Sequence, residues 1–168
     1  MQPPSLIVTL QLDPAAQAFF NAQRARYFPA HANYTDAHLT LFHHLPAHDA
    51  VQHILAAKAS RPTFPVAVTG LFNMGNGVAY TLRSAALEAL HEDLQQCFAP
   101  WLSQRDRQPL WPHVTIQRKV TAYKAAQLQQ LLEQDFRPFT VQALGLYTWH
   151  YRKGPWQAAG AWAFTAPA

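Results

Sequence analysis

The chain has 168 residues, of which 49% are hydrophobic and only 13% are charged, with a formal net charge of +4. Such an apolar composition excludes disorder, and the length is that of one domain. The single Cys97 excludes a disulfide framework and a cysteine-based zinc site, and no apolar run reaches the roughly 18 residues that a membrane span needs.

The first half of the chain alternates between strand and helix signals. An aliphatic stretch without a basic leader opens the chain, and we expect a strand there and no signal peptide. Asp13-Pro14 then provides a helix cap followed by proline at the first helical position. In chain order, the sequence predicts a strand at Leu6–Leu12, a helix to about Phe28, a strand at His38–Phe42, a helix starting at Pro46, a strand at Phe64–Val68, a turn at Asn73–Gly77 and a strand at Val78–Leu82.

The second half shows the same kinds of signals in a similar order. Ser84 caps a helix with an apolar stripe, which Pro100 ends, and Thr121 caps another helix. The predicted strands of this half are His113–Ile116, Phe139–Leu146 and a last strand near Trp156–Phe164.

Two separate segments of the halves match at one offset. His38 and His113 are 75 residues apart, and Phe64–Leu71 matches Phe139–Leu146 at the same separation, with Phe, Val, Gly and Leu coinciding. We infer an internal duplication within a single domain spanning residues 1–168. The predicted fold is α+β, with two lobes related by a pseudo-twofold axis, each an antiparallel sheet with helices on the outside.

Each lobe carries a His-x-Thr-aliphatic tetrapeptide, at residues 38–41 and 113–116. Side chains alternate along a strand, so His38 and Thr40 face one way while the aliphatic residues face the core. The same holds for His113 and Thr115. A pseudo-twofold axis brings both faces together, which predicts a central cleft with two imidazoles and two hydroxyls.

Two imidazoles on either side of a phosphodiester are suited to its cleavage. Histidine titrates near neutrality, so one ring can accept a proton while the other donates one. The threonine hydroxyls can hydrogen-bond the non-bridging oxygens. Because neither motif contains a carboxylate, and the other histidines lack the spacing of ligands, we expect no metal and no other cofactor.

These paired motifs, in matching repeat context, resemble the 2H phosphoesterase superfamily, and within it the branch of 2′-5′ RNA ligases and RNA 2′,3′-cyclic phosphodiesterases. The resemblance covers nearly the whole chain. It implies a bilobal α+β fold and metal-independent opening of a 2′,3′-cyclic phosphate to a 2′-phosphate, sometimes with reversible 2′-5′ ligation. It also implies His38 and His113 as the catalytic pair, with Thr40 and Thr115 as phosphate contacts. Which histidine is the acid and which the base depends on the orientation of the substrate.

Further contacts follow from extending the strand alternation. Phe42 and His44 are expected on the cleft face of the first motif, and Gln117 and Lys119 on that of the second. Phe42 is predicted to stack on a base and Lys119 to meet a phosphate. A basic cluster lies beside the second motif, and aromatic and cationic residues mix near the carboxyl end; either group is also consistent with an ordinary loop or core.

Three functions remain open from the sequence. The first is a cytoplasmic, monomeric enzyme acting on an RNA end with a 2′,3′-cyclic phosphate, without a membrane or an obligate protein partner. The second is the same chemistry on a small cyclic nucleotide or an ADP-ribose cyclic phosphate. The third, from a different class, is a nucleotide-binding or RNA-binding module without turnover.

Overall fold

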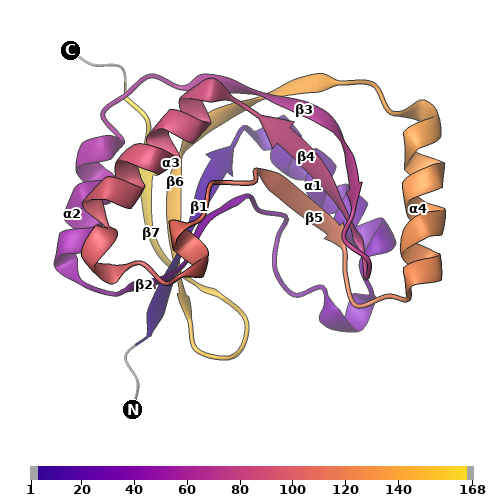
Figure 1. Cartoon of the computed structure of the whole chain (residues 1–168), viewed down its shortest axis with the longest axis horizontal. Helices are drawn as coiled ribbons and strands as arrows, with labels where there is room; N and C mark the ends of the chain where they lie inside the picture. Colours follow the sequence, from indigo (N-terminus) through magenta and orange to yellow (C-terminus); the bar gives the residue numbers. More distant parts are fainter. Residues whose placement is uncertain (1–3, 166–168) are drawn as a thin grey trace.

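One antiparallel sheet of seven strands runs through the molecule in the order β2-β1-β6-β3-β4-β5, with β7 paired to β6 (Figure 1). The computed structural model describes residues 4–165, so Met1–Pro3, which open the amino-terminal stretch, lie outside it. Its strands are β1 (Ser5–Leu12), β2 (Thr40–Pro46), β3 (Phe64–Asn73), β4 (Val78–Arg83), β5 (His113–Gln117), β6 (Phe139–Tyr151) and β7 (Gln157–Ala163). Its α-helices are α1 (Pro14–Tyr27), α2 (Asp49–Lys58), α3 (Ala85–Cys97) and α4 (Ala122–Asp135).

The helix starts predicted from capping residues are confirmed. The side chain of Asp13 accepts a hydrogen bond from Ala16 N at 3.0 Å, that of Ser84 from Leu87 N at 3.1 Å, and that of Thr121 from Lys124 N at 3.2 Å. Each oxygen satisfies one of the backbone N–H groups that a helix leaves unpaired in its first turn.

Several predicted boundaries were wrong, and β3 continues five residues beyond the predicted Val68 to Asn73. Pro46 does not start a helix but ends β2, and α2 begins at Asp49. Proline has no N–H to donate to a neighbouring strand, and it is tolerated there because β2 is an edge strand of the sheet. β6 continues five residues beyond the predicted Leu146 to Tyr151, because it pairs with β1 on one side and with β3 and β7 along its length.

The pairing of β3 with β6 is symmetric about its middle. Val66 lies opposite Val141, Phe64 lies opposite Ala143, and Val68 lies opposite Phe139. Adding 75 to the residue numbers of β3 therefore reproduces the same set of pairs, as a twofold axis through the Val66–Val141 pair requires. The duplication of the chain stays an inference, and this register supports it.

The α+β class and the antiparallel sheet are confirmed, but the two sheets predicted for separate lobes are joined through β3 and β6 into one. We call β2, β1, β6 and β7 the first half of the sheet, and β3, β4 and β5 the second. Helix α1, which follows β1 of the first half, packs on β5 of the second; α4 packs on β3, and α2 packs with α3 (Figure 1). One continuous buried cluster joins both halves. Among residues 4–165, no helix combines the length and the hydropathy that crossing a membrane requires.

Candidate active site

The two motif histidines lie where β2 and β5, the strands at opposite ends of the sheet order, begin. His113 is the first residue of β5, whereas β2 begins only at Thr40, so His38 precedes its strand rather than lying in it as predicted. The aliphatic residues of both motifs are buried in the core, as their alternation predicts: Leu39, Leu41, Val114 and Ile116. The two histidines are only partly buried.

The backbone holds both imidazoles in the same way. Nδ1 of His38 lies 2.8 Å from the carbonyl oxygen of Asp36, and Nδ1 of His113 lies 2.8 Å from that of Trp111. Each carbonyl belongs to the residue two positions before the histidine. Because a carbonyl oxygen can only accept a hydrogen bond, Nδ1 carries the proton in the neutral ring. Nε2 then has no proton and can accept one.

A bulge in each motif strand overturns two predicted contacts. Thr9 pairs with Thr40 but Val8 with Phe42, so one extra residue interrupts β2, and the same shift occurs in β5 between Thr115 and Gln117. A bulge breaks the alternation of side chains. Phe42 is consequently fully buried and stacks on His91, with ring centroids 4.8 Å apart, and is not a base-stacking residue of the cleft. Gln117 is also buried.

The residues after the bulges take the places that Phe42 and Gln117 were expected to fill. His43 and Arg118, which are again 75 residues apart, line one open cavity of about 730 Å³ together with His38, Thr115 and Lys119. The predicted cleft position of Lys119 thus agrees with the structure, although Lys119 lies beyond β5 with a φ of 61°. His44 is exposed instead of facing this cavity.

A buried carboxylate holds β2 just after this bulge, at a second register shift between Phe42 and Leu45. Asp106 is 4% exposed, and its oxygens accept hydrogen bonds from His43 N at 2.9 and 3.0 Å and from His44 N at 2.9 Å. Arg105, next to it in the chain, lines the cavity. Sequence reasoning missed Asp106, because its partners are backbone groups 62 and 63 residues away.

Arg24 is a second residue of the site that sequence reasoning missed. It lies on α1, is 5% exposed, and donates from Nη1 to the carbonyl of Thr115 at 3.1 Å and from Nε to Asn33 Oδ1 at 3.1 Å. Its guanidinium also lies over the ring of Phe28. Arg24 therefore ties α1, from the first part of the chain, to the motif strand of the second.

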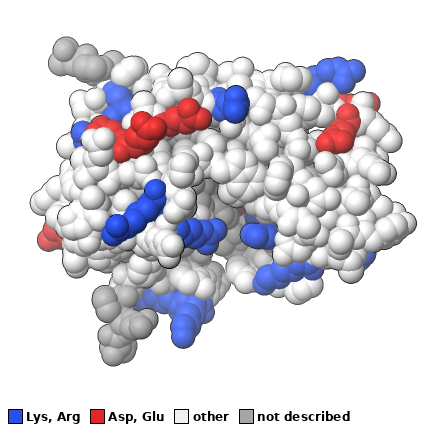
Figure 2. Space-filling model, in the orientation of Figure 1, with Lys and Arg blue, Asp and Glu red and all other residues white. Residues whose placement is uncertain are grey.

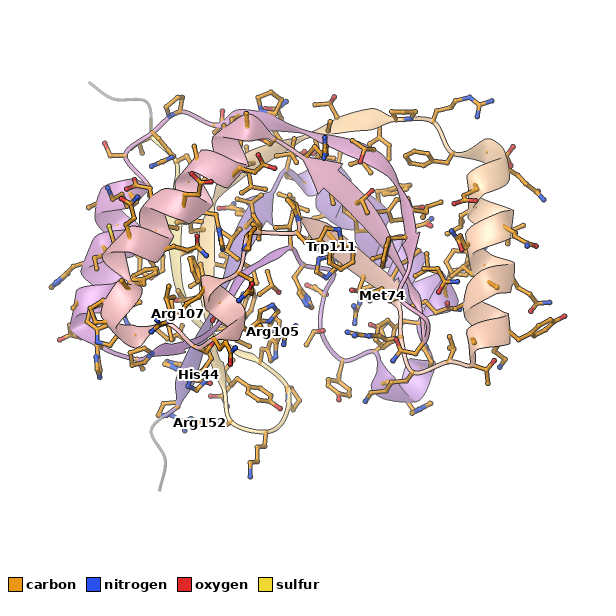
Figure 3. The ribbon with its side chains drawn as sticks, viewed as in Figure 1. His44, Met74, Arg105, Arg107, Trp111 and Arg152 are labelled. Atoms are coloured by element: carbon orange, nitrogen blue, oxygen red, sulfur yellow. The ribbon has the colours of Figure 1, made fainter. Side chains whose placement is uncertain are left out.

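Basic side chains surround the opening of the cleft. Figure 2 shows Lys and Arg around a central hollow, with the acidic residues away from it. Figure 3 shows Arg105, Arg107, His44 and Arg152 in the same lower left part of the view. Of the predicted basic cluster, Arg105, Arg118 and Lys119 line the cavity, whereas Arg107 donates to the carbonyl of Leu102. The positive electrostatic potential of these side chains favours an anion in the hollow.

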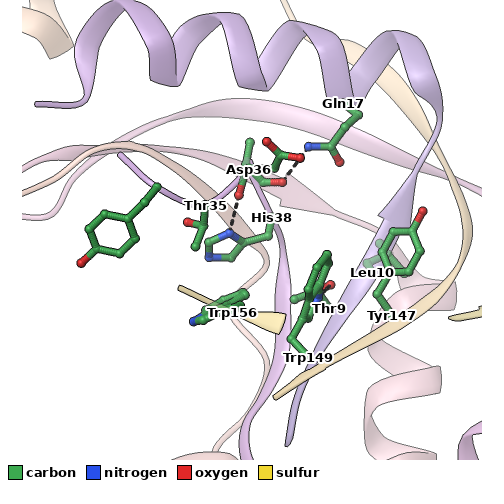
Figure 4. A pocket seen from close by; sticks show the side chains of 11 residues that line it. Thr9, Leu10, Gln17, Thr35, Asp36, His38, Tyr147, Trp149 and Trp156 are labelled. Carbon is green, nitrogen blue, oxygen red and sulfur yellow. Dashed lines mark hydrogen bonds between the residues drawn. The ribbon is translucent and has the colours of Figure 1, made fainter. Parts of the chain in front are cut away.

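A second, aromatic cavity, more enclosed than the first, lies beside His38 (Figure 4). It measures about 370 Å³ and is lined by Trp156, Trp149 and Tyr147, together with polar groups that include Gln17 and Thr35. Trp156, from the connection between β6 and β7, covers the His38 ring with centroids 4.5 Å apart. The aromatic residues near the carboxyl end thus belong to the site.

Burial keeps the cleft imidazoles neutral. Loss of solvent, with further lowering by Arg24, His113 and His43, reduces the pKa of His38 to about 4. Burial and Arg105 lower the pKa of His43 to about 4, and burial also lowers the pKa of His113. All three rings are neutral at pH 7 in the free protein, and a bound anion would raise their pKa values again.

Comparisons with known proteins point to one family. The protein-family model described as the 2′-5′ RNA ligase superfamily matches residues 12–154. The chain is 19% identical to E. coli LigT in complex with NADP+, with a TM-score of 0.62, covering 98% of this chain and 99% of that chain. For TT0787 of Thermus thermophilus the identity is 14% and the TM-score 0.66, with 98% and 100% of the chains covered. No curated protein sequence matches the chain.

Proposed function

The chain belongs to the 2′-5′ RNA ligase superfamily of 2H phosphoesterases, and we propose that it opens 2′,3′-cyclic phosphates to 2′-phosphates. The observation that carries this proposal is the pair of imidazoles, His38 and His113, held by equivalent carbonyl contacts. His38 lines the basic cavity of about 730 Å³, and His113 lines a cavity of about 200 Å³ that shares His43 and Arg105 with it. The family supports phosphoester chemistry on RNA-related substrates, and the finer assignment rests on this geometry.

Two proton transfers accompany the reaction. A water oxygen attacks phosphorus while one neutral imidazole accepts its proton at Nε2. The bond between phosphorus and the ribose O3′ breaks, and the other ring, as imidazolium, donates its proton to that oxygen. The product is a 2′-phosphate with a free 3′-hydroxyl. When a 5′-hydroxyl replaces water, the same transfers produce a 2′-5′ linkage.

The remaining cleft residues stabilise the phosphate. We assign Thr40 and Thr115 as hydroxyl donors to the non-bridging oxygens, and Arg118 and Lys119 as the cations that balance the charge of the phosphorane. The free site lacks a protonated imidazole, and the anionic substrate provides for one. A phosphate next to a neutral histidine ring raises the pKa of that ring, so one imidazole can hold the acidic proton. This chemistry needs imidazole, hydroxyl and cationic groups and no metal.

The substrate class follows from the cavity beside His38. Its volume of about 370 Å³ and its tryptophan walls are suited to one nucleoside, which we take as the one that bears the cyclic phosphate. The basic rim favours an RNA strand attached to that nucleoside. The enclosed cavity also favours a second candidate, a small cyclic nucleotide or ADP-ribose cyclic phosphate.

The test is turnover in the presence of EDTA. An oligonucleotide ending in a 2′,3′-cyclic phosphate and a cyclic mononucleotide are offered separately, and the products are identified by chromatography. We expect a 2′-phosphate from both and a higher kcat/KM for the longer substrate; equal values would favour the small-molecule candidate. Binding of both without any 2′-phosphate would overturn the proposal in favour of a binding module.

A further inference from the structure

His43 lies between the two motif histidines, although it belongs to neither tetrapeptide. It lines the basic cavity of about 730 Å³ together with His38, and it also lines the cavity of about 200 Å³ together with His113. Arg105 is likewise shared by both cavities. A phosphate that both motif histidines can reach therefore lies next to the imidazole of His43.

The repeat gives His43 a counterpart in the second half of the cleft. Adding 75 to its number leads to Arg118, which also lines the larger cavity. The same offset relates the two motif histidines to each other, and the two motif threonines. Arginine is a permanent cation, whereas a histidine at the equivalent place provides a positive charge only when its ring is protonated. A phosphate between the halves therefore meets a fixed cation on one side and a titratable group on the other.

The backbone at both positions is held by contacts from outside the motifs. Both oxygens of the buried Asp106 accept hydrogen bonds from His43 N, where β2 shifts its register. In the second half, Gly77 lies so close to β5 that a Cβ there would collide with the carbonyl oxygen of Gln117, the residue before Arg118. These contacts constrain the strands where their side chains depart from regular alternation. The fold thus holds both side chains in the cleft.

The groups around His43 oppose its protonation in the free protein. Burial and the cation of Arg105 lower its pKa to about 4, while the carboxylate of Asp106 acts in the opposite direction. A phosphate in the cavity brings negative charge next to the ring and raises this pKa again. The charged groups and histidines that line the two cavities with His43 are Arg24, Arg105, Arg118, Lys119, Lys153, His38, His91, His113 and Asp106.

We propose that His43 is a phosphate-binding residue, which contacts a non-bridging oxygen on the side opposite Arg118 and takes up a proton as the anion enters. This inference rests on the proposed function and adds to it a residue that neither motif contains. The proton comes from solvent, binds the unprotonated nitrogen of the ring, and is donated in a charge-assisted hydrogen bond to the phosphate oxygen. No bond of the substrate breaks in this step. Because the complex holds one proton more than the free protein, its affinity should rise as the pH falls.

Proton uptake on binding tests the proposal without turnover. The ligand is adenosine 2′-phosphate, and calorimetry in buffers of different ionisation enthalpy gives its Kd and the protons taken up at pH 6 and at pH 8. His43→Gln removes the titratable ring, and His43→Arg replaces it by a fixed cation. The matched control is His44→Gln, which removes the exposed neighbouring histidine, whose backbone N contacts the same Asp106. The ionisation of the ligand itself is common to all four proteins.

We expect His43→Gln to bind the nucleotide roughly tenfold more weakly than the unaltered protein at pH 6, as the loss of a charge-assisted hydrogen bond does. The difference should shrink towards pH 8, where the unaltered ring also stays neutral. His43→Gln and His43→Arg should both take up fewer protons at pH 6, but His43→Arg should keep its affinity at both pH values. His44→Gln should match the unaltered protein.

Three results would overturn the proposal. Equal weakening by His43→Gln at pH 6 and pH 8 would show a structural role alone, an unchanged proton uptake would place the proton elsewhere, and no binding to the unaltered protein would remove the phosphate contact. If circular dichroism shows that His43→Gln is unfolded, the proton uptake of His43→Arg decides in the same way. Turnover of a cyclic phosphate together with any of these results retains the proposed function, whereas the expected pH dependence without turnover retains the phosphate contact and removes the function.

Discussion

The first and second halves of the cleft share their chemistry and differ in their surroundings. Both present a histidine held by the carbonyl two residues earlier, both continue into a threonine, and both strands bulge after it. Yet His38 faces an enclosed cavity under Trp156, whereas His113 stacks on the exposed Trp111. Symmetric groups can serve the phosphate, while the asymmetric walls give the substrate one orientation.

Removing either histidine tests the shared chemistry and has the largest expected effect. His38→Ala and His113→Ala should each lower kcat for cyclic-phosphate opening by about 10²- to 10⁴-fold, because each removes one proton-transfer group. Rates are measured with a cyclic mononucleotide, and circular dichroism checks the fold. A variant that keeps most of its activity would show that the two halves are not chemical equivalents.

Removing the wall on the His38 side tests the difference between the halves. Trp156→Ala should raise the Kd of a nucleoside 2′-phosphate roughly tenfold, because it deletes a stacking surface. Calorimetry measures the change, with Tyr123→Ala, which removes an exposed ring on α4, as the control. An unchanged Kd would mean that the enclosed cavity is not the nucleoside site.

A comparison of Lys119 with Lys124 distinguishes the effect of a cation in the cleft from that of a cation on the neighbouring surface. Lys119 lines the large cavity, whereas Lys124 lies in the first turn of α4. Lys119→Ala should weaken binding of a cyclic-phosphate oligonucleotide a few-fold and reduce the slope of log Kd against log salt by about one. Lys124→Ala should leave that slope as it is. The same slope in both variants would contradict the phosphate contact of Lys119.

The pH dependence of the free energy of unfolding tests the burial of the two histidines, with a smaller expected effect than the substitutions above. Burial lowers the pKa of His38 to about 4, and that of a histidine in the unfolded chain is near 6.5. Between these values the unfolded chain binds more protons, so the free energy of unfolding decreases as the pH falls through this window. Urea unfolding at several pH values measures the decrease.

Burial lowers the pKa of both His38 and His113, so His38→Asn and His113→Asn should each flatten this pH dependence. A variant with an unchanged pH dependence would contradict the burial of the imidazole that it removes.

Local rules predicted much of the fold and half of the site. Capping residues placed the starts of α1, α3 and α4, because a cap depends only on nearby residues. The 75-residue offset identified both motifs, because it compares residue types along the sequence alone. The bulges were missed because they depend on how β2 and β5 pair with their neighbours, and they exchanged Phe42 for His43 in the cleft.

The residues that support the cleft were beyond the reach of sequence patterns. Asp106 and Arg24 bind backbone groups far along the chain, His43 N and the Thr115 carbonyl respectively. Neither contact leaves a periodicity or a motif. Only the arrangement of the whole sheet brings them together.

The packing of α1 on β5 has a consequence for how this protein holds together. A fragment ending near the β3–β4 turn would contain α1 without β5, the strand on which α1 packs, and β3 without β6, one of its partners. Neither this fragment nor the remainder would bury its own apolar faces, so we expect the two to fold only on meeting.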